Sequence, residues 1–147
     1  MRVACVLALA VGCAPAEEPV VVDEPIWEAD PIGGLWEVIE VEDADGTEPY
    51  PLALDSGITR HRLVELGPRL RWGRVEVVDV SAVTAQAWYR ANLRIEPNSD
   101  GTWWMEDTLS RDYGLCTYEP DPGIVCENAE VGAVHRLAPS VWPEVTP

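Results

Sequence analysis

The chain has 147 residues, of which 26 are acidic and 10 are basic, so its formal net charge at pH 7 is −16. A chain of this length is expected to form one domain, and so acidic a surface repels nucleic acids and anionic lipid headgroups. We therefore do not expect this protein to bind DNA or RNA.

The chain begins with Met1, Arg2 and an apolar run over 3–11, which ends at Gly12 and Cys13. A secretory apolar region has about 7–15 residues, whereas a membrane-spanning helix needs about 20. The last five residues of this stretch, Leu-Ala-Val-Gly-Cys, resemble a bacterial lipobox, a family in which the cysteine becomes the acylated N-terminus. An ordinary signal peptide cleaved near residues 14–16 is the alternative.

The lipobox resemblance implies a signal peptide over 1–12 and lipid attachment at Cys13. Two or more acyl chains hold a protein stably on a membrane without a spanning segment. We therefore expect a bacterial cell-envelope protein that is anchored to the outer rather than the inner membrane, with its domain in the periplasm or at the cell surface. Residues 13–33 are rich in proline and acidic side chains, which predicts a semi-extended tether.

From residue 34 onward, turn signals recur every 10–15 residues and separate β-branched and aromatic runs. This pattern is typical of an antiparallel all-β domain, which we expect over 34–138, followed by a tail over 139–147. Either a small up-and-down barrel or a β-sandwich would satisfy it. About eight strands are predicted, near 34–42, 57–66, 69–79, 86–95, 102–109, 112–118, 123–128 and 131–137.

Two of these strands carry further expectations. In the strand near 86–95, one face is expected to point to the core, and it consists of Ala87, Tyr89, Ala91, Leu93 and Ile95. The segment 81–92 is also rich in alanine, so a short helix capped by Ser81 is the alternative there. The strand near 34–42 has no clean period, which indicates a bulge or burial on both faces.

Four cysteines are present, and two of them fall at or before the lipobox cysteine. The remaining pair, Cys116 and Cys126, flanks the strong turn signal at 119–123. Antiparallel pairing around that turn would place the two side chains opposite each other, and exported proteins form disulfides. The sequence therefore predicts a Cys116–Cys126 disulfide. A redox or metal site is the alternative, but the spacing does not suit one.

The Gly34-Leu35-Trp36 start resembles the Gly-x-Trp opening of lipocalins and of lipocalin-like bacterial lipoproteins. That resemblance implies an eight-stranded up-and-down barrel in which Trp36 closes one end. It also implies an Asp-Tyr pair between strands and an arginine near the last strand that packs on the tryptophan. Asp112, Tyr113 and Arg136 are the residues of this chain that match those places.

Seven of the ten arginines lie within 56–95, a segment that contains three acidic residues. One interpretation is a basic and aromatic outer face that meets a partner, and the other is ordinary strand surfaces with weak cross-strand ion pairs. The candidates for such an interaction surface are Arg60, Arg62, Arg71, Trp72, Trp88 and Arg90. Trp103 and Trp104 are adjacent strand residues and must point to opposite faces.

No motif for catalysis, a metal or a cofactor is present. The only histidines are His61 and His135, the carboxylates at 42–48 suit a turn better than calcium, and Glu106 and Asp107 must face opposite ways. We therefore expect no enzymatic activity, no cofactor and no metal. The hypothesis is a membrane-anchored envelope lipoprotein whose barrel binds a small apolar or amphiphilic ligand. The alternative is a structural or protein-interaction lipoprotein with a packed core and an Arg/Trp outer face.

Overall fold

A computed structural model describes residues 31–121 and 123–144 of the chain. The signal peptide, the lipid site at Cys13 and most of the tether lie outside the described residues and stay predictions. No helix within the described part is long and apolar enough to cross a membrane.

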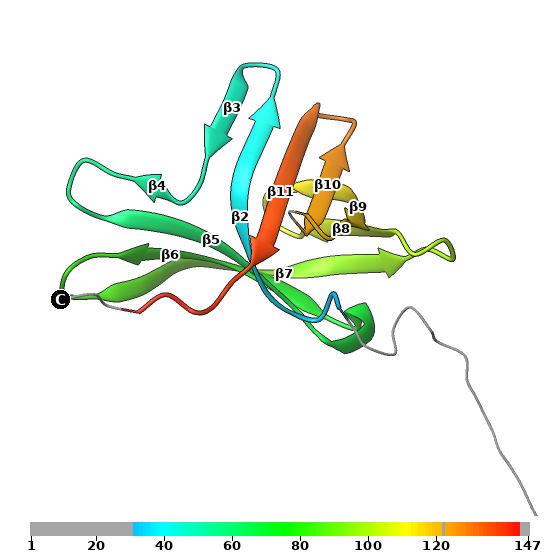
Figure 1. Ribbon diagram of the computed structural model, residues 1–147, viewed down its shortest axis with the longest axis horizontal. Coiled ribbons are helices and arrows are strands. Elements are labelled where there is room, and N and C mark those ends of the chain that lie inside the picture. Colours follow the sequence, from blue (N-terminus) through cyan, green and yellow to red (C-terminus); the bar gives the residue numbers. More distant parts are fainter. Residues whose placement is uncertain (1–30, 122, 145–147) are drawn as a thin grey trace, which may run out of the picture. The chain divides into compact units, whose positions relative to one another are not determined.

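The described chain is built almost entirely from strands (Figure 1). They are β2 (Gly34–Asp43), β3 (Gly46–Pro49), β4 (Leu52–Ala53), β5 (Thr59–Leu66), β6 (Gly73–Val80), β7 (Ala85–Pro97), β8 (Trp103–Asp107), β9 (Tyr113–Tyr118), β10 (Ile124–Asn128) and β11 (Ala133–Pro139). One short 3-10 helix, η2 (Pro68–Leu70), joins β5 to β6.

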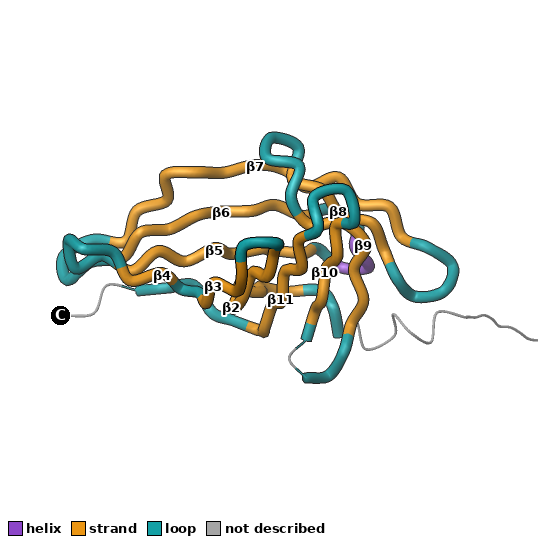
Figure 2. Tube along the Cα trace, turned by 90° about the horizontal axis from the view of Figure 1, so that it is seen from above, coloured by secondary structure: helices purple, strands orange, loops and turns teal. Residues whose placement is uncertain are grey.

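The sheet closes on itself, and neighbouring strands are antiparallel throughout. Its order is β3-β2-β11-β10-β9-β8-β7-β6-β5-β4, and β2 also pairs with β5. That additional pairing joins residues 34–37 to residues 63–66 and completes an eight-stranded barrel (Figure 2). The chain therefore forms the predicted up-and-down barrel and not a sandwich. The short strands β3 and β4 were not predicted, and they lie beside β2 and β5 at one end of the barrel.

The alternative helix over 81–92 is wrong, because β7 begins at Ala85 and pairs with β6 from Ala85 to Asn92. Ser81 instead caps a tight turn, in which its hydroxyl accepts hydrogen bonds from the backbone N–H groups of Val83 and Thr84, both at 3.3 Å. Alanine has no strong strand preference, so tertiary pairing decides the conformation of this segment.

Two bulges interrupt the alternation of side chains. In β2, the pairing with β11 skips Ile39, which explains the missing period of that strand. In β7, Tyr89 pairs with Val77 and Ala87 with Val78, so Trp88 is the extra residue. The prediction that Ala87 shares a face with Tyr89 is therefore wrong. The face stays regular from Tyr89 onward, where Leu93 is buried.

One end of the barrel, hereafter the packed end, is filled by apolar side chains around Trp36. The indole Nε1 of Trp36 donates a hydrogen bond to the carbonyl of Ile32 at 2.7 Å. The rings of Trp36 and Tyr118 pack edge to face, with their centres 6.3 Å apart. Gly123 is required here, because a Cβ atom at this position would lie 2.7 Å from the Trp36 ring. Other side chains of this core are fully enclosed, among them Trp103, Met105, Ile124 and Leu137.

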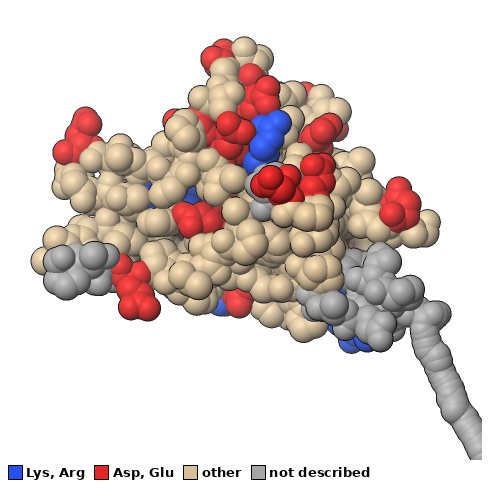
Figure 3. Space-filling model, viewed as in Figure 1, with Lys and Arg blue, Asp and Glu red and all other residues tan. Residues whose placement is uncertain are grey.

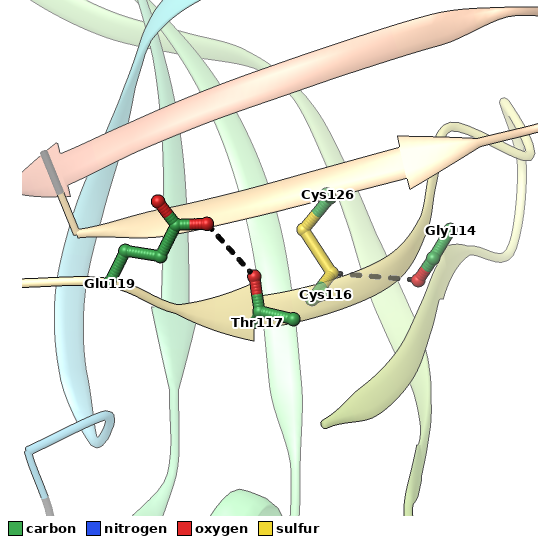
Figure 4. The surroundings of a disulfide bond; sticks show 5 residues. All are labelled: Gly114, Cys116, Thr117, Glu119 and Cys126. Atoms are coloured by element: carbon green, nitrogen blue, oxygen red, sulfur yellow. Dashed lines mark hydrogen bonds between the residues drawn. A yellow bond between two sulfur atoms is a disulfide. The ribbon is translucent and has the colours of Figure 1, made fainter. Parts of the chain in front are cut away.

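The predicted disulfide is present between β9 and β10 (Figure 4). Cys116 and Cys126 are directly paired residues of these strands, their Cα atoms are 4.0 Å apart, and both side chains are fully buried. In the chain-entropy model, a crosslink over so short a loop stabilises the fold by about 2–3 kcal/mol. The bond ties β10 to β9, the strand that carries both Tyr113 and Tyr118.

The remaining sequence predictions at turns are confirmed. The acidic segment near residue 45 forms the tight turn between β2 and β3, in which the carboxylate of Asp43 accepts a hydrogen bond from the backbone N–H of Asp45 at 2.8 Å. The Asp100-Gly101 turn joins β7 to β8, and Gly101 has a φ of 91°. Trp103 is fully buried, whereas Trp104 lies on the other face of β8 and is half-buried.

Candidate functional site

A pocket of about 300 Å³ opens at the end of the barrel opposite Trp36, hereafter the polar end. It lies at the ends of strands β5 to β9 and beside the segment between β3 and β4. Its lining combines an apolar floor, four aromatic side chains, two arginines and several carboxylates. The residues used below are Tyr50, Arg60, Arg62, Val77, Trp88, Tyr89, Asp107, Ser110, Asp112 and Tyr113.

Arg62 projects from β5 into this pocket. It pairs across the sheet with Val77, which in turn pairs with Tyr89, so the three side chains share the inner face. Its Nη2 donates a hydrogen bond to Asp112 Oδ2 at 3.2 Å, and its guanidinium lies 5.4 Å from the centre of the Tyr50 ring. Burial opposes the charge of Arg62, but the neighbouring Tyr113, Tyr50 and Asp112 outweigh this and raise its pKa. Arg62 is a cation held inside the barrel.

Tyr113 begins β9 with a φ of 91°, a value that side-chain-bearing residues rarely adopt. Such strain is typical of functional sites, where the surrounding structure enforces it. Its side chain is 1% exposed, and its hydroxyl has no hydrogen-bond partner among the described residues. Burial raises the pKa of Tyr113 to about 12, although the positive charge of Arg62 opposes this. The hydroxyl is therefore protonated at neutral pH and available as a donor.

His135 lies beneath the Tyr113 ring, with the two ring centres 4.8 Å apart. It is 2% exposed, and its Nδ1 atom also lacks a partner among the described residues. Burial, with the positive charge of Arg62, lowers the pKa of His135 to about 4, against a smaller opposing effect of Asp112. His135 is therefore uncharged at neutral pH, and Arg62 is the cation among Arg62, Tyr113 and His135.

Arg60 differs from Arg62 in how its charge is matched. Its Nε and Nη2 atoms donate hydrogen bonds to both carboxylate oxygens of Asp79, at 2.8 and 2.9 Å. Its guanidinium also stacks over the Trp88 ring at 4.5 Å. Hydrogen bonding between them raises the pKa of Arg60 and lowers that of Asp79. Arg60 therefore lines the pocket with its charge already matched by Asp79.

The carboxylate of Asp107 is likewise hydrogen-bonded to groups of the protein. The Tyr89 hydroxyl donates to its two carboxylate oxygens at 3.0 and 2.9 Å, and the backbone N–H groups of Leu109 and Ser110 donate to Oδ1. It is 2% exposed, whereas Glu106 on the opposite face pairs with Arg111 outside the barrel. The prediction that Glu106 and Asp107 do not converge is therefore confirmed.

Asp107 and Asp112 both line the pocket, because the turn between β8 and β9 returns the chain to the same end of the barrel. The backbone N–H of Asp107 donates to the carbonyl of Asp112 at 3.2 Å. The sequence also offers Asp112 as a partner for Glu106 and Asp107, but the opposite orientation of those two adjacent residues argues against a converging pair. The signal that could have found this pair was the turn between them, because a short turn returns the chain to the same end of a barrel.

The six candidates for an outer interaction face do not form one face. Arg60, Arg62 and Trp88 line the pocket, because they occupy the inner side of β5 or the β7 bulge. Arg90 pairs with Glu76 at 2.8 Å, and this arginine is exposed. The last two, Arg71 and Trp72, lie in the exposed loop after η2.

The residues carried over from the lipocalin resemblance also separate. Gly34 and Trp36 begin β2 at the packed end, but Asp112 and Tyr113 lie at the polar end. Arg136 pairs with Glu40 at 2.9 Å and with Glu42 at 3.1 Å, and Trp36 faces Pro139 in the ladder. The expectation that Arg136 packs on Trp36 is wrong, because its register places it beside acidic partners.

Acidic residues predominate on the molecular face of Figure 3, with few basic residues among them. Within the described chain, no cluster of three or more His, Cys, Asp or Glu residues is arranged to hold a metal ion. The chain matches no protein-family model, and no curated protein or solved structure is significantly similar to it.

Proposed function

We propose that this protein is a lipid-anchored protein of the bacterial cell envelope, and that its barrel binds one small amphiphilic ligand at the polar end. The observation that carries the binding proposal is the pocket of about 300 Å³. Its size is at the lower end of small-molecule sites, which are mostly apolar and contain a few polar groups that orient the ligand. An eight-stranded barrel has room for one small ligand.

The pocket suits a molecule with two chemically different parts. Val77 and the rings of Tyr50 and Trp88 supply surface for an apolar body, and aromatic side chains offer large contact areas. Arg62, Tyr89 and the Tyr113 hydroxyl supply the polar groups. The resemblance of Gly34-Leu35-Trp36 to the lipocalin opening supports the same function, although it does not identify the ligand.

The anchor proposal depends on the lipobox-like residues 9–13 and on the disulfide. Disulfides persist in oxidising compartments such as the periplasm and cell surface, so the Cys116–Cys126 bond agrees with export. We expect Cys13→Ser to move the full-length protein from the membrane fraction to the soluble fraction. Retention of this variant on membranes after a high-salt wash would contradict the anchor.

Binding is tested with the full-length Cys13→Ser protein and the neutral fluorescent amphiphile N-phenyl-1-naphthylamine. We expect saturable binding of one molecule per chain. Val77→Trp should remove it by filling the pocket, whereas Val125→Trp should not, because Val125 pairs with Arg136 on the outside of β10. Thermal unfolding of both variants checks that they are folded, and Val77→Leu provides a milder filling. Absence of saturable binding by the parent protein would leave the structural or interaction lipoprotein as the better function.

A further inference from the structure

We infer that the ligand of this pocket carries a carboxylate group, which accepts hydrogen bonds from Arg62 and from the Tyr113 hydroxyl. This inference deepens the proposed function and depends on it. It goes further because it names the chemical class of the ligand: a monocarboxylic acid with a flat or aromatic apolar body.

The first observation is the incomplete pairing of Arg62. A guanidinium group has five N–H donors, and those of Arg62 face one oxygen of Asp112 at 3.2 Å and the hydroxyls of Tyr50 and Tyr113, so Arg62 has no paired, two-point contact with a carboxylate. Asp112 is itself shared, because it also accepts a hydrogen bond from the Ser110 hydroxyl at 3.0 Å. Arg60, in contrast, has two short hydrogen bonds to one carboxylate. Arg62 is therefore the arginine of the pocket that retains donors for a ligand.

The second observation concerns Tyr113, which lines the same pocket. Its hydroxyl is buried beside Arg62, and no described residue meets it with the distance and angle of a full hydrogen bond. Buried polar groups are almost always hydrogen-bonded, so an unpartnered one marks a position where a bound group completes the arrangement. Tyr113 and Arg62 are close enough for each to influence the ionisation of the other. One acceptor group of a ligand can thus contact both donors.

A carboxylate suits these donors better than the other common anions. Arginine pairs with planar carboxylates through two parallel hydrogen bonds, and it also binds phosphate. Asp107 and Asp112 already place negative charge at the pocket, which disfavours a doubly charged phosphate more than a singly charged carboxylate. The aromatic surfaces of Tyr50 and Trp88 then remain for the body of the acid.

The test compares two molecules of nearly equal shape, 2-naphthoate and the uncharged 2-naphthamide, by isothermal titration calorimetry at pH 7. The full-length Cys13→Ser protein is used, so that no acyl chain competes for the pocket. We expect naphthoate to bind about tenfold more tightly or better, the effect of a hydrogen-bonded charge. Arg62→Gln should remove this preference, and Tyr113→Phe should reduce it severalfold.

The matched control is Arg90→Gln, because Arg90 is a paired arginine on the outside of the same sheet. It should bind both compounds as the parent does. Thermal unfolding verifies that each variant is folded. If Arg62→Gln does not fold, Arg62→Lys is tested in its place. Lysine keeps the positive charge but cannot make two parallel hydrogen bonds to a carboxylate, so the preference for naphthoate over naphthamide should weaken.

The outcomes separate the two proposals. Equal binding of naphthoate and naphthamide, or an Arg62→Gln variant that still prefers naphthoate, would overturn the carboxylate inference and leave ligand binding intact. Tighter binding of 2-naphthyl phosphate than of naphthoate would overturn the carboxylate class in favour of a phosphate. Failure of all these compounds and of N-phenyl-1-naphthylamine to bind would reject the proposed function itself.

Discussion

The two ends of the barrel are built by the same strands but differ in what fills them. Strand β9 reaches both: Tyr118 contacts Trp36 at the packed end, and Tyr113 lies over His135 at the polar end. At the packed end the indole N–H of Trp36 has a backbone partner. At the polar end, by contrast, the charged guanidinium of Arg62 is held inside the barrel beside Asp112. Buried polar atoms without partners among the described residues occur in both regions, namely Trp103 Nε1 in the packed core and the Tyr113 hydroxyl and His135 Nδ1 at the polar end.

This difference indicates a division of roles between the ends. Apolar burial is the main favourable term in folding, so the packed end should supply most of the stability. Burying a charged group such as Arg62 costs free energy, and proteins retain such costs mainly at functional sites. Substitutions at the packed end should therefore affect unfolding, and substitutions at the polar end should affect binding.

The largest expected contrast compares two tryptophans. Trp36→Ala removes a side chain that is 4% exposed and should lower the free energy of unfolding by about 4 kcal/mol. Trp88→Ala removes a ring that is 53% exposed and mainly stacks on Arg60, so it should cost about 1 kcal/mol. Urea unfolding monitored by circular dichroism measures both values. Equal losses would contradict the division between the ends.

The second prediction concerns pH and His135, whose charged neighbours are Arg62 and Asp112. Because burial lowers its pKa from 6.5 to about 4, the unfolded chain binds more protons than the folded chain between these pH values. Stability is therefore complete above pH 6.5 and is lost as the pH falls toward 4. Between pH 7 and pH 5 this histidine should account for a loss of about 2 kcal/mol.

The control for this prediction is His135→Phe, which keeps an aromatic ring but cannot bind a proton. Urea unfolding at pH 7 and pH 5 should show a smaller loss for His135→Phe than for the parent protein. The difference between the two proteins isolates the histidine from the many carboxylates that titrate in the same range. An identical loss in both would show that His135 is not a buried neutral base.

The smallest expected change in stability comes from Tyr113→Phe. The hydroxyl of Tyr113 is buried without a described partner, so its removal should stabilise the fold by about 1 kcal/mol. The same variant should bind 2-naphthoate more weakly. Tyr118→Phe is the matched control at the packed end, where the hydroxyl does not line the pocket. A destabilised Tyr113→Phe would show that this hydroxyl has a structural role.

Part of the candidate site was accessible from the sequence. In the strand predicted over 57–66, simple alternation places Arg60 and Arg62 on the same face as Val64 and Leu66, which are buried. Two inward arginines were therefore foreseeable, although they were interpreted as surface residues. The place of Trp88 beside them was not foreseeable, since it depends on one extra residue in β7.

The sequence by itself determined the local features of this protein: the eight main strands, the hairpin turns and the disulfide across one of them. These depend on residue spacing and turn chemistry within short segments. Only the tertiary structure decided which distant residues meet, such as Arg62 and Asp112, which are 50 positions apart. These contacts depend on three features of the whole sheet: the closure of the barrel between β2 and β5, the two bulges, and the positive φ at Tyr113. They result from pairing geometry around the whole sheet, which local periodicity does not encode.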